Sequence, residues 1–294
     1  MIYGVLVLLG VVTARFGVVF FKDIYTNRKN LETETNFGLN VGLGFVTDVF
    51  DTLGIGNFAP TTALLRGFKQ VQDRVLPGTL NVSHTIPVIL EAFLFLTVIK
   101  VDIITLIAMI TSSVAGAVLG AGIVSRLPEK TIRLTMGIAL IITAFLMICG
   151  QMEWIKDLGT GDAIGLRGIK LAIGIVGNFI LGALMTAGVG LYAPCMALVY
   201  VLGMSPAVAF PIMMGSCAFL MPPASAKFIK YGAYNKKASL GITTGGVFGV
   251  LLAVYIIKSL PLRTLTWLVI GVIVITAFTL LRAALRSKTK PVTQ

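Results

Sequence analysis

The sequence predicts an all-α polytopic membrane protein with two inverted-topology repeats that contain discontinuous helical hairpins, preceded by one extra N-terminal helix. Three observations support this prediction: an apolar composition, a matching pair of Gly/Pro clusters, and the placement of the basic residues. Hydrophobic residues make up 56% of the 294 residues, and the mean hydropathy is +0.95. Charged residues are only 12%, about half the roughly 25% usual in soluble domains. These values exclude an ordinary soluble domain and a disordered chain.

Apolar runs of membrane-spanning length divide the chain, since about 20 residues at ~1.5 Å rise cross the hydrocarbon core. They lie at 1–21, 37–65, 79–99, 103–125, 134–149, 168–202, 208–226, 238–257 and 264–281. The first run lacks the basic leader and cleavage site of a secretory signal, so we expect a retained helix. Runs 37–65 and 168–202 are too long for one crossing and too short for two comfortable ones. Pro222-Pro223 is expected to break the run 208–226 near its end.

The two long runs are interrupted by matching clusters. Gly54-Ile55-Gly56 leads to Pro60, and Gly188-Val189-Gly190 leads to Pro194, 134 residues later. Leu127-Pro128 recurs as Leu260-Pro261 and Ile142–Phe145 as Ile275–Phe278, both 133 residues later. We therefore predict an N-terminal helix and linker (1–35), repeat 1 (36–150), an extracytoplasmic linker (151–167), repeat 2 (168–284) and a cytoplasmic basic tail (285–294).

The basic residues indicate the orientation. A net charge of +12 would suggest nucleic-acid binding in a soluble protein, but in a membrane protein it first indicates cytoplasmic loops. Segments 66–78, 126–133, 227–237 and the C-terminal tail hold 14 of the 24 Lys and Arg residues and only two acids. Placing all four in the cytoplasm makes equivalent helices of the two repeats run in opposite directions. Each interrupted run must then turn back at its cluster. The neutral segment 22–35 leaves the side of the N-terminus open.

The paired interruptions predict a binding site between the repeats. Irregular backbone at membrane depth persists only where it is buried or lines a wet cavity. A helix that starts just after a glycine turn directs free N–H groups back at that turn. Pro60 and Pro194 suit the first turn of such helices, where the missing N–H is not needed. Two facing helix starts would bind an anion without a buried lysine. The alternative for either cluster alone is close packing through small residues.

The pattern Gly-x-Gly-x-x-x-Pro, present twice in a basic membrane protein of this size, resembles the TauE/SafE family of sulfite exporters and related permeases. The resemblance covers roughly residues 35–281, and it implies movement of sulfite, an organosulfonate or another small anion. The family motif carries over to Gly54, Gly56, Pro60, Gly188, Gly190 and Pro194. Further glycines are usual in that family where this chain has Asn57-Phe58 and Leu191-Tyr192. Larger side chains at these positions would reshape the pocket for a different anion.

Two sets of candidate site residues follow. The substrate-binding candidates are Gly54, Gly56, Asn57, Pro60, Thr61, Ser83, Gly188, Gly190, Tyr192, Pro194 and Ser216. The proton-coupling candidates are Asp48, Asp51 and His84, because intramembrane carboxylates tend to face a cavity and histidine titrates near neutral pH. The alternatives are a capping or interfacial role for the two acids, and a purely structural one for His84 and likewise for Glu91. Asp102 is expected to be solvated beside a short turn.

These features predict a secondary transporter, a permease or exporter of a small sulfur-containing anion such as sulfite or an organosulfonate, with proton coupling as a further hypothesis. A passive anion channel is the first alternative. A membrane-embedded enzyme is less favoured, because one histidine and two aspartates are few groups for a catalytic site. We expect no metal and no cofactor, since the three cysteines form no Cys-x-x-Cys pair. The expected partners are the small anionic substrate and membrane lipid, not nucleic acid, and a homodimer is left open. The predicted location is the cytoplasmic (cell inner) membrane, multi-pass, with a cytoplasmic C-terminus.

Overall fold

The computed structural model describes residues 2–95, 101–154, 162–256 and 262–286. Within these ranges the chain forms eleven α-helices, one short 3-10 helix and a single bridge between Ala163 and Met204. The elements are α1 (Ile2–Thr26), α2 (Phe37–Thr52), α3 (Phe58–Gly67), η1 (Asp73–Val75), α4 (Leu76–Phe95), α5 (Ile103–Val124), α6 (Glu129–Gln151), α7 (Gly168–Thr186), α8 (Tyr192–Val201), α9 (Pro206–Lys230), α10 (Lys236–Ile256) and α11 (Leu262–Arg286). Leu260-Pro261, the middle of the 151–167 linker and most of the basic tail lie outside the described residues.

Seven of the described helices are long and apolar enough to cross a membrane: α1, α5, α6, α7, α9, α10 and α11. Large apolar side chains point outward from them, including Val18, Ile169 and Phe278. In hydrocarbon such side chains meet lipid, and a helix satisfies its own backbone hydrogen bonds. The prediction of a helical, multi-pass membrane protein is therefore confirmed.

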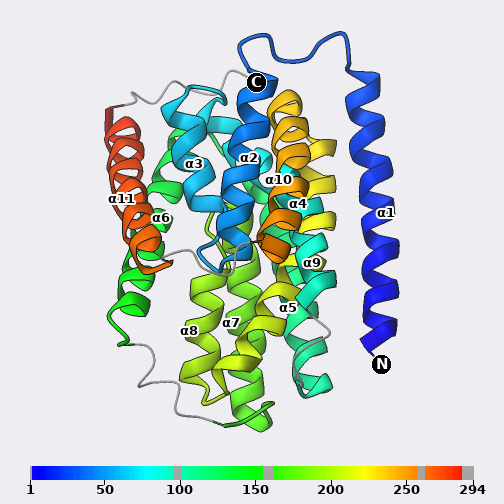
Figure 1. The fold of residues 1–294 in the computed structure, drawn as a ribbon, viewed down its shortest axis with the longest axis vertical. Coiled ribbons are helices and arrows are strands. Elements are labelled where there is room, and N and C mark those ends of the chain that lie inside the picture. Colours follow the sequence, from blue (N-terminus) through cyan, green and yellow to red (C-terminus); the bar gives the residue numbers. More distant parts are fainter. Residues whose placement is uncertain (1, 96–100, 155–161, 257–261, 287–294) are drawn as a thin grey trace.

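The helices differ in how deeply they are enclosed. In the most apolar stretch of α9, 83% of the residues are buried, whereas in that of α1 only 17% are. Figure 1 shows α1 at one side of the bundle, where it packs on α9 and α4. The prediction that Pro222-Pro223 breaks its helix is wrong, because α9 continues through both prolines to Lys230. A membrane helix tolerates internal prolines where neighbouring helices enclose it, as they enclose α9.

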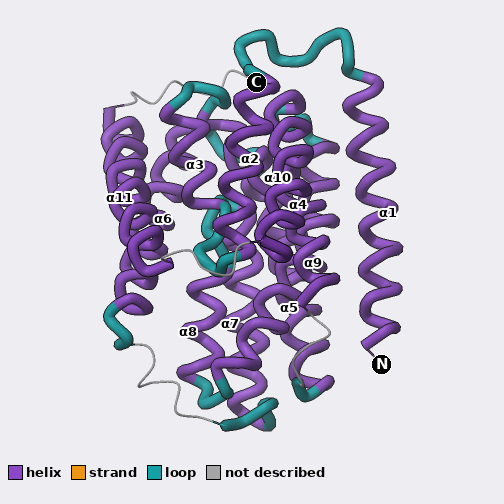
Figure 2. Tube along the Cα trace, in the orientation of Figure 1, coloured by secondary structure: helices purple, strands orange, loops and turns teal. Residues whose placement is uncertain are grey.

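Each long apolar run contains a longer helix and a short one of 10 residues, joined by a turn. Residues 53–57 separate α2 from α3, and residues 187–191 separate α7 from α8. Gly54, Gly56 and Gly188 have φ of 85°, 90° and 96°, a conformation that side chains with a Cβ rarely adopt. Pro60 and Pro194 are each the third residue of the helix that follows. The pair α2/α3 and the pair α7/α8 occupy opposite halves of the bundle (Figures 1 and 2).

The helices of the two halves make matching contacts. α2 packs along α10, and α7 packs along α5. Gly249 lies so close to the backbone of Phe45 that a Cβ there would collide with its carbonyl group. Gly116 makes the same contact with Phe179. The two glycines are 133 residues apart and the two phenylalanines 134, which is the spacing of the sequence repeat.

Candidate functional site

A small buried cavity lies where the two turns meet. Its volume is about 30 Å³, which is room for about two water molecules. Residues 55–59 line it from the first turn and residues 190–192 from the second. The other lining side chains are Asp51, Val88, Thr143, Met147, Met185 and Cys217. In this conformation the cavity has room for water but not for a larger ligand.

Both helix starts face this cavity. In α3 the first helical bond runs from the Thr61 N–H to the Asn57 carbonyl, and in α8 from Cys195 to Leu191, each at 2.9 Å. The N–H groups ahead of these bonds have no partner within their own helix, and the partial positive charge of each helix lies there. Asn57 is the N-cap residue of α3, but its side chain does not cap the helix.

The hydroxyl of Thr143, on α6, also belongs to the cavity. Its side chain is 7% exposed, and its oxygen has no hydrogen-bond partner among the described residues. An unpaired buried hydroxyl costs roughly 1–3 kcal/mol, so a molecule in the cavity is its expected partner. Sequence reasoning used Thr143 only as part of the repeated stretch. The available signal was its recurrence as Thr276, whose hydroxyl instead donates to the Val272 carbonyl at 2.8 Å.

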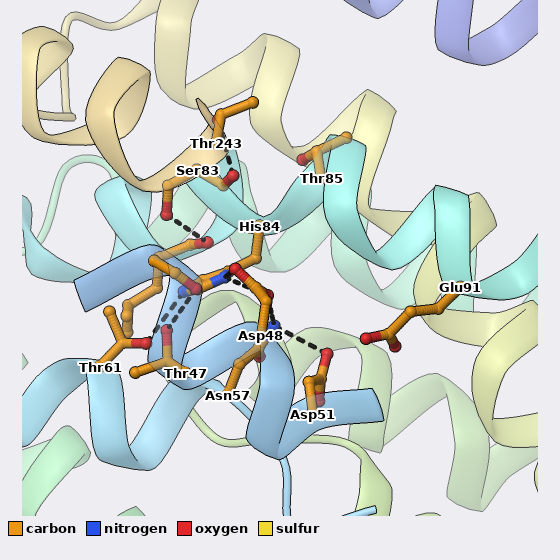
Figure 3. Close-up of polar contacts among 12 residues, drawn as sticks. Thr47, Asp48, Asp51, Asn57, Thr61, Ser83, His84, Thr85, Glu91 and Thr243 are labelled. Carbon is orange, nitrogen blue, oxygen red and sulfur yellow. Dashed lines mark hydrogen bonds and ion pairs between the residues drawn. The ribbon is translucent and has the colours of Figure 1, made fainter. Parts of the chain in front are cut away.

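The three proton-coupling candidates form one buried network with Asn57 and Thr61 (Figure 3). The Nδ1 atom of His84 lies 2.8 Å from an Asp48 carboxylate oxygen, and its Nε2 atom lies 3.0 Å from the Thr61 hydroxyl. The Asn57 amide donates one hydrogen to Asp48 at 2.9 Å and the other to Asp51 at 2.8 Å. Asn57 therefore holds both aspartates beside the cavity.

Glu91 extends this network to the second half of the chain. The Tyr192 hydroxyl lies 3.1 Å from a Glu91 carboxylate oxygen and 3.5 Å from one of Asp51. The Thr52 hydroxyl lies 2.7 Å from the other Glu91 oxygen. Sequence reasoning left Glu91 outside the candidate set. The available signal was its spacing of seven residues from His84, which places both on one face of α4.

The other candidates lie in different places. Gly56, Asn57, Gly190 and Tyr192 line the cavity. Gly54, Pro60, Gly188 and Pro194 shape the turns and helix starts, and Thr61 reaches the network through His84. Ser83 and Ser216 are not among the residues that line the cavity. Ser83 donates to the Leu80 carbonyl at 3.3 Å, and Ser216 accepts from the Asn178 amide at 2.9 Å.

A much larger cavity of about 1120 Å³ opens near residues 32–35, 66–75 and 232–236, and we call it the vestibule. Acidic and basic side chains both line it, namely Glu32, Glu34, Asp73 and Glu129 and Arg66, Lys69, Arg133 and Lys236. Asp73 accepts hydrogen bonds from Arg66 and Arg133, each at 2.8 Å. Burial alone would raise the pKa of Asp73, but the hydrogen bonds and charges of these two arginines outweigh it and lower the pKa.

Asp102 immediately precedes α5, at the N-terminal end of that helix. Its side chain is 20% exposed, in keeping with the prediction of a solvated group, and it accepts from the Thr105 N–H at 2.9 Å as the N-cap of α5. It also accepts two hydrogen bonds from Arg167, each at 2.8 Å. The Arg167 hydrogen bonds lower the pKa of Asp102, and Asp102 raises the pKa of Arg167. Sequence spacing gave no sign of this contact, which joins residues 65 positions apart.

No protein-family model, curated protein or solved structure matches this chain. The resemblance to the TauE/SafE family therefore stays a prediction. Among the described residues, no group of three or more His, Cys, Asp and Glu side chains could hold a metal ion. The site thus consists of two helix starts, one unpaired hydroxyl and a buried acidic network around the small central cavity.

Proposed function

We propose that this protein is a secondary transporter of a small anion, with sulfite and short organosulfonates as the first substrates to test. The observation that carries the proposal is the convergence of the α3 and α8 helix starts and the Thr143 hydroxyl on one cavity. Backbone N–H groups at a helix start and a free hydroxyl are donors suited to an oxyanion. Among the described residues that line this cavity, none is Lys or Arg.

The transport cycle is alternating access between two inverted-topology repeats, α2–α6 and α7–α11. Support comes from the hairpins in opposite halves of the bundle and from the glycine contacts made twice at the repeat spacing. Inverted repeats with broken helices typically bind substrate at the repeat interface. Because α2 packs on α10 and α5 packs on α7 across that interface, the moving parts proposed here are the short helices α3 and α8. By the positive-inside rule, the vestibule opens to the cytoplasm.

The α3 helix is the barrier between the vestibule and the central cavity. Its first residues, Phe58 and Ala59, line the central cavity, whereas Ala63, Arg66 and Gly67 near its end line the vestibule. Movement of α3 would join the two spaces and enlarge the central one. The conformation described here is therefore a closed state of the cycle, with its aqueous approach on the cytoplasmic side.

The acidic network requires protons to take part. Asp51 lines the central cavity, and two unit charges of like sign about 4 Å apart repel by about 4 kcal/mol at an effective dielectric constant of about 20. Anion binding is therefore favoured when the network carries an added proton. This links the anion and the proton in one binding step, so a proton gradient can drive the anion.

The first test is a thermal-shift screen of the purified protein against sulfite, short alkanesulfonates, sulfate, nitrate and formate, with choline as a cation control. The expected result is stabilisation by at least one sulfur oxyanion and none by choline. Labelled uptake into proteoliposomes follows for any stabilising anion. If none of these anions stabilises the protein or is transported, the proposed substrate class is wrong.

Gly190 provides a matched pair of variants for the same assay. A Cβ built on Gly190 meets nothing within 4 Å, and the residue lines the cavity. Gly190→Leu should fill the cavity and stop uptake, whereas Gly190→Ala should retain it. Anion uptake that does not depend on an imposed pH gradient would instead favour the passive anion channel.

A further inference from the structure

Three carboxyl groups are buried in the network, on Asp48, Asp51 and Glu91. Among the described side chains, the only basic one bonded to them is His84, at Asp48. A buried charge without a partner is costly, so a group in this position takes up a proton instead. One imidazole can balance at most one of the three carboxylates. The network therefore holds at least one proton, and the hydrogen-bond partners indicate which carboxyl exchanges it.

Asn57 fixes one oxygen of Asp48 and one oxygen of Asp51 as hydrogen-bond acceptors. Each aspartate accepts an N–H from Asn57, and an amide N–H can only donate. If the bonded oxygen took up a proton, two donors would face one another and the hydrogen bond would be lost. Asn57 uses both of its amide hydrogens in this way. These contacts keep the bonded oxygen of each aspartate an acceptor, and at Asp48 the His84 ring adds a second contact. The other oxygen of Asp51 has no bond to Asn57, so the variant Asp51→Asn tests that group separately.

The partners of Glu91 are of a different kind. Its two oxygens meet the hydroxyls of Thr52 and Tyr192, and a hydroxyl can either donate or accept. The Asp51 carboxyl also lies within hydrogen-bonding reach of Glu91. Thr52 also lies 2.9 Å from the backbone carbonyl of Asp48, which is a second acceptor for its hydrogen. When Glu91 is ionised, Thr52 donates to it. When Glu91 is protonated, its O–H donates to Thr52, and the threonine hydrogen turns to the Asp48 carbonyl.

Tyr192 connects Glu91 to the central cavity. It is the first residue of α8, it lines the cavity, and its hydroxyl lies between Glu91 and Asp51. Figure 3 shows the Glu91 carboxyl directed towards Asp51. The single hydroxyl hydrogen of Tyr192 goes to Glu91 while Glu91 is ionised. Protonation of Glu91 releases that hydrogen for Asp51 or for an anion in the cavity.

We propose that Glu91 is the carboxyl that gains and loses the exchangeable proton, and that Tyr192 transmits its protonation state to the central cavity. In this step a proton from water binds a Glu91 oxygen, and the Thr52 and Tyr192 hydroxyls reorient. The link to substrate movement rests on the proposed transport function, whereas the proton exchange at Glu91 does not.

The surroundings of Glu91 contain other groups that titrate. α2 contributes Asp48 and Asp51, α4 itself His84, α8 Tyr192 and α9 Cys217. α10 faces the cluster with Gly246, against Asp48, and α1 faces α4 with Gly10, against Phe93. The test therefore has to separate Glu91 from the two aspartates.

Infrared pH-difference spectroscopy of the full chain in lipid nanodiscs provides this separation without any substrate. Exposed Asp and Glu are ionised above about pH 5, so a carboxylic-acid carbonyl band above that pH reports a buried group. We expect this band in the wild type and in Asp51→Asn, and its loss in Glu91→Gln. A band that persists in Glu91→Gln overturns the proposal. If Glu91→Gln does not fold, Glu91→Asp replaces it, and a band unchanged in frequency and pH midpoint overturns the proposal equally.

The transport arm uses an anion that the wild type exchanges. Glu91→Gln should keep exchange of labelled for unlabelled anion, which needs no net proton movement, and lose accumulation driven by a pH gradient. Tyr192→Phe should keep the infrared band and weaken the accumulation. Accumulation by Glu91→Gln equal to that of the wild type overturns the proposal. If the wild type exchanges no anion, the transport function fails, and the infrared result still decides whether Glu91 exchanges a proton.

Discussion

The two helix breaks have the same backbone but very different chemistry. Each consists of a left-handed glycine turn, a helix start and a proline in the third helical position. At the repeat spacing, however, Asp48 corresponds to Gly182, Asp51 to Met185, Asn57 to Leu191, His84 to Cys217 and Glu91 to Ala224. The duplicated unit thus supplies two facing helix starts, whereas the buried carboxyl groups and the histidine among the described residues lie around the first break.

The neutral counterpart near the second break is a small amide network. The Asn178 side chain donates to the Met109 carbonyl at 2.8 Å and to the Ser216 hydroxyl at 2.9 Å. It holds α7 against α5 and α9 without any charge. Under the proposed function both breaks face the anion and only the first carries the carboxyl groups that would exchange protons, and paired substitutions can break or sharpen this distinction.

The largest difference in stability is expected between Asp48→Asn and Ser216→Ala. Asp48→Asn weakens two buried hydrogen bonds to a carboxylate, from His84 and Asn57, each worth roughly 1.5–3 kcal/mol. Loss of one neutral hydrogen bond costs about 1 kcal/mol, and Asn178 keeps its bond to Met109. Thermal unfolding in matched detergent micelles measures both. Equal losses would show that the two networks play the same structural part.

The next prediction concerns ligand affinity and uses the repeated threonines. Thr143→Val removes a free hydroxyl from the cavity and should weaken anion binding about tenfold, in line with about 1.4 kcal/mol for one lost hydrogen bond to an anion. Thr276→Val removes a hydroxyl already bonded to its own helix and should leave affinity within about twofold. Titration of the stabilising anion by thermal shift compares them. If Thr276→Val bound the anion more weakly than Thr143→Val, the proposed site would be contradicted.

A smaller effect separates the turn glycines themselves. Gly54→Ala and Gly188→Ala both place a Cβ in a left-handed conformation, at a cost of roughly 1–2 kcal/mol. At Gly54 the Cβ meets nothing within 4 Å, whereas at Gly188 it lies 2.8 Å from the Met136 Cε. Gly188→Ala should therefore be the less stable variant in denaturation measurements. The reverse order would mean that the first turn is the more tightly constrained.

The smallest effect is expected outside the membrane, at Asp73. Because its folded pKa is lowered, the stability it contributes is present above its unfolded pKa of about 3.9 and is lost as the pH falls through the folded pKa. Asp73→Asn should cost about 1 kcal/mol or less at neutral pH, since solvent screens the vestibule. The difference from the wild type should shrink as the pH falls below the unfolded pKa of about 3.9 and vanish below the lowered folded pKa. A constant difference at all pH values would remove the charge of Asp73 from the explanation.

The backbone of the site was predictable from sequence because glycine and proline act locally. The clusters at Gly54–Pro60 and Gly188–Pro194 locate both turns and both helix starts without any tertiary information. The expectation for Pro222-Pro223 failed because it applied a rule for isolated helices to the most enclosed of the seven candidate membrane spans. Local propensity holds where the chain itself sets the conformation, and neighbouring helices override it elsewhere.

The side-chain contacts of the site were not predictable in the same way. Glu91 meets Tyr192 across 101 residues of sequence, and the Thr143 hydroxyl is left unpaired only because of how α6 packs beside the two turns. Both depend on which faces of distant helices meet. The repeat alignment reduces this gap, since a residue type present at one break and absent from the other marks a position with its own chemistry.

The backbone-to-backbone glycine contacts limit what can move. Where Gly249 touches Phe45 and Gly116 touches Phe179, the helices interlock without intervening side chains that could slide or reorient. The pairs α2–α10 and α5–α7 then behave as two rigid helix pairs. The hinges lie in the glycine turns that connect these pairs to α3 and α8. Engineered disulfides within either helix pair should leave the proposed transport activity intact. A disulfide that links α3 to α11 should abolish it.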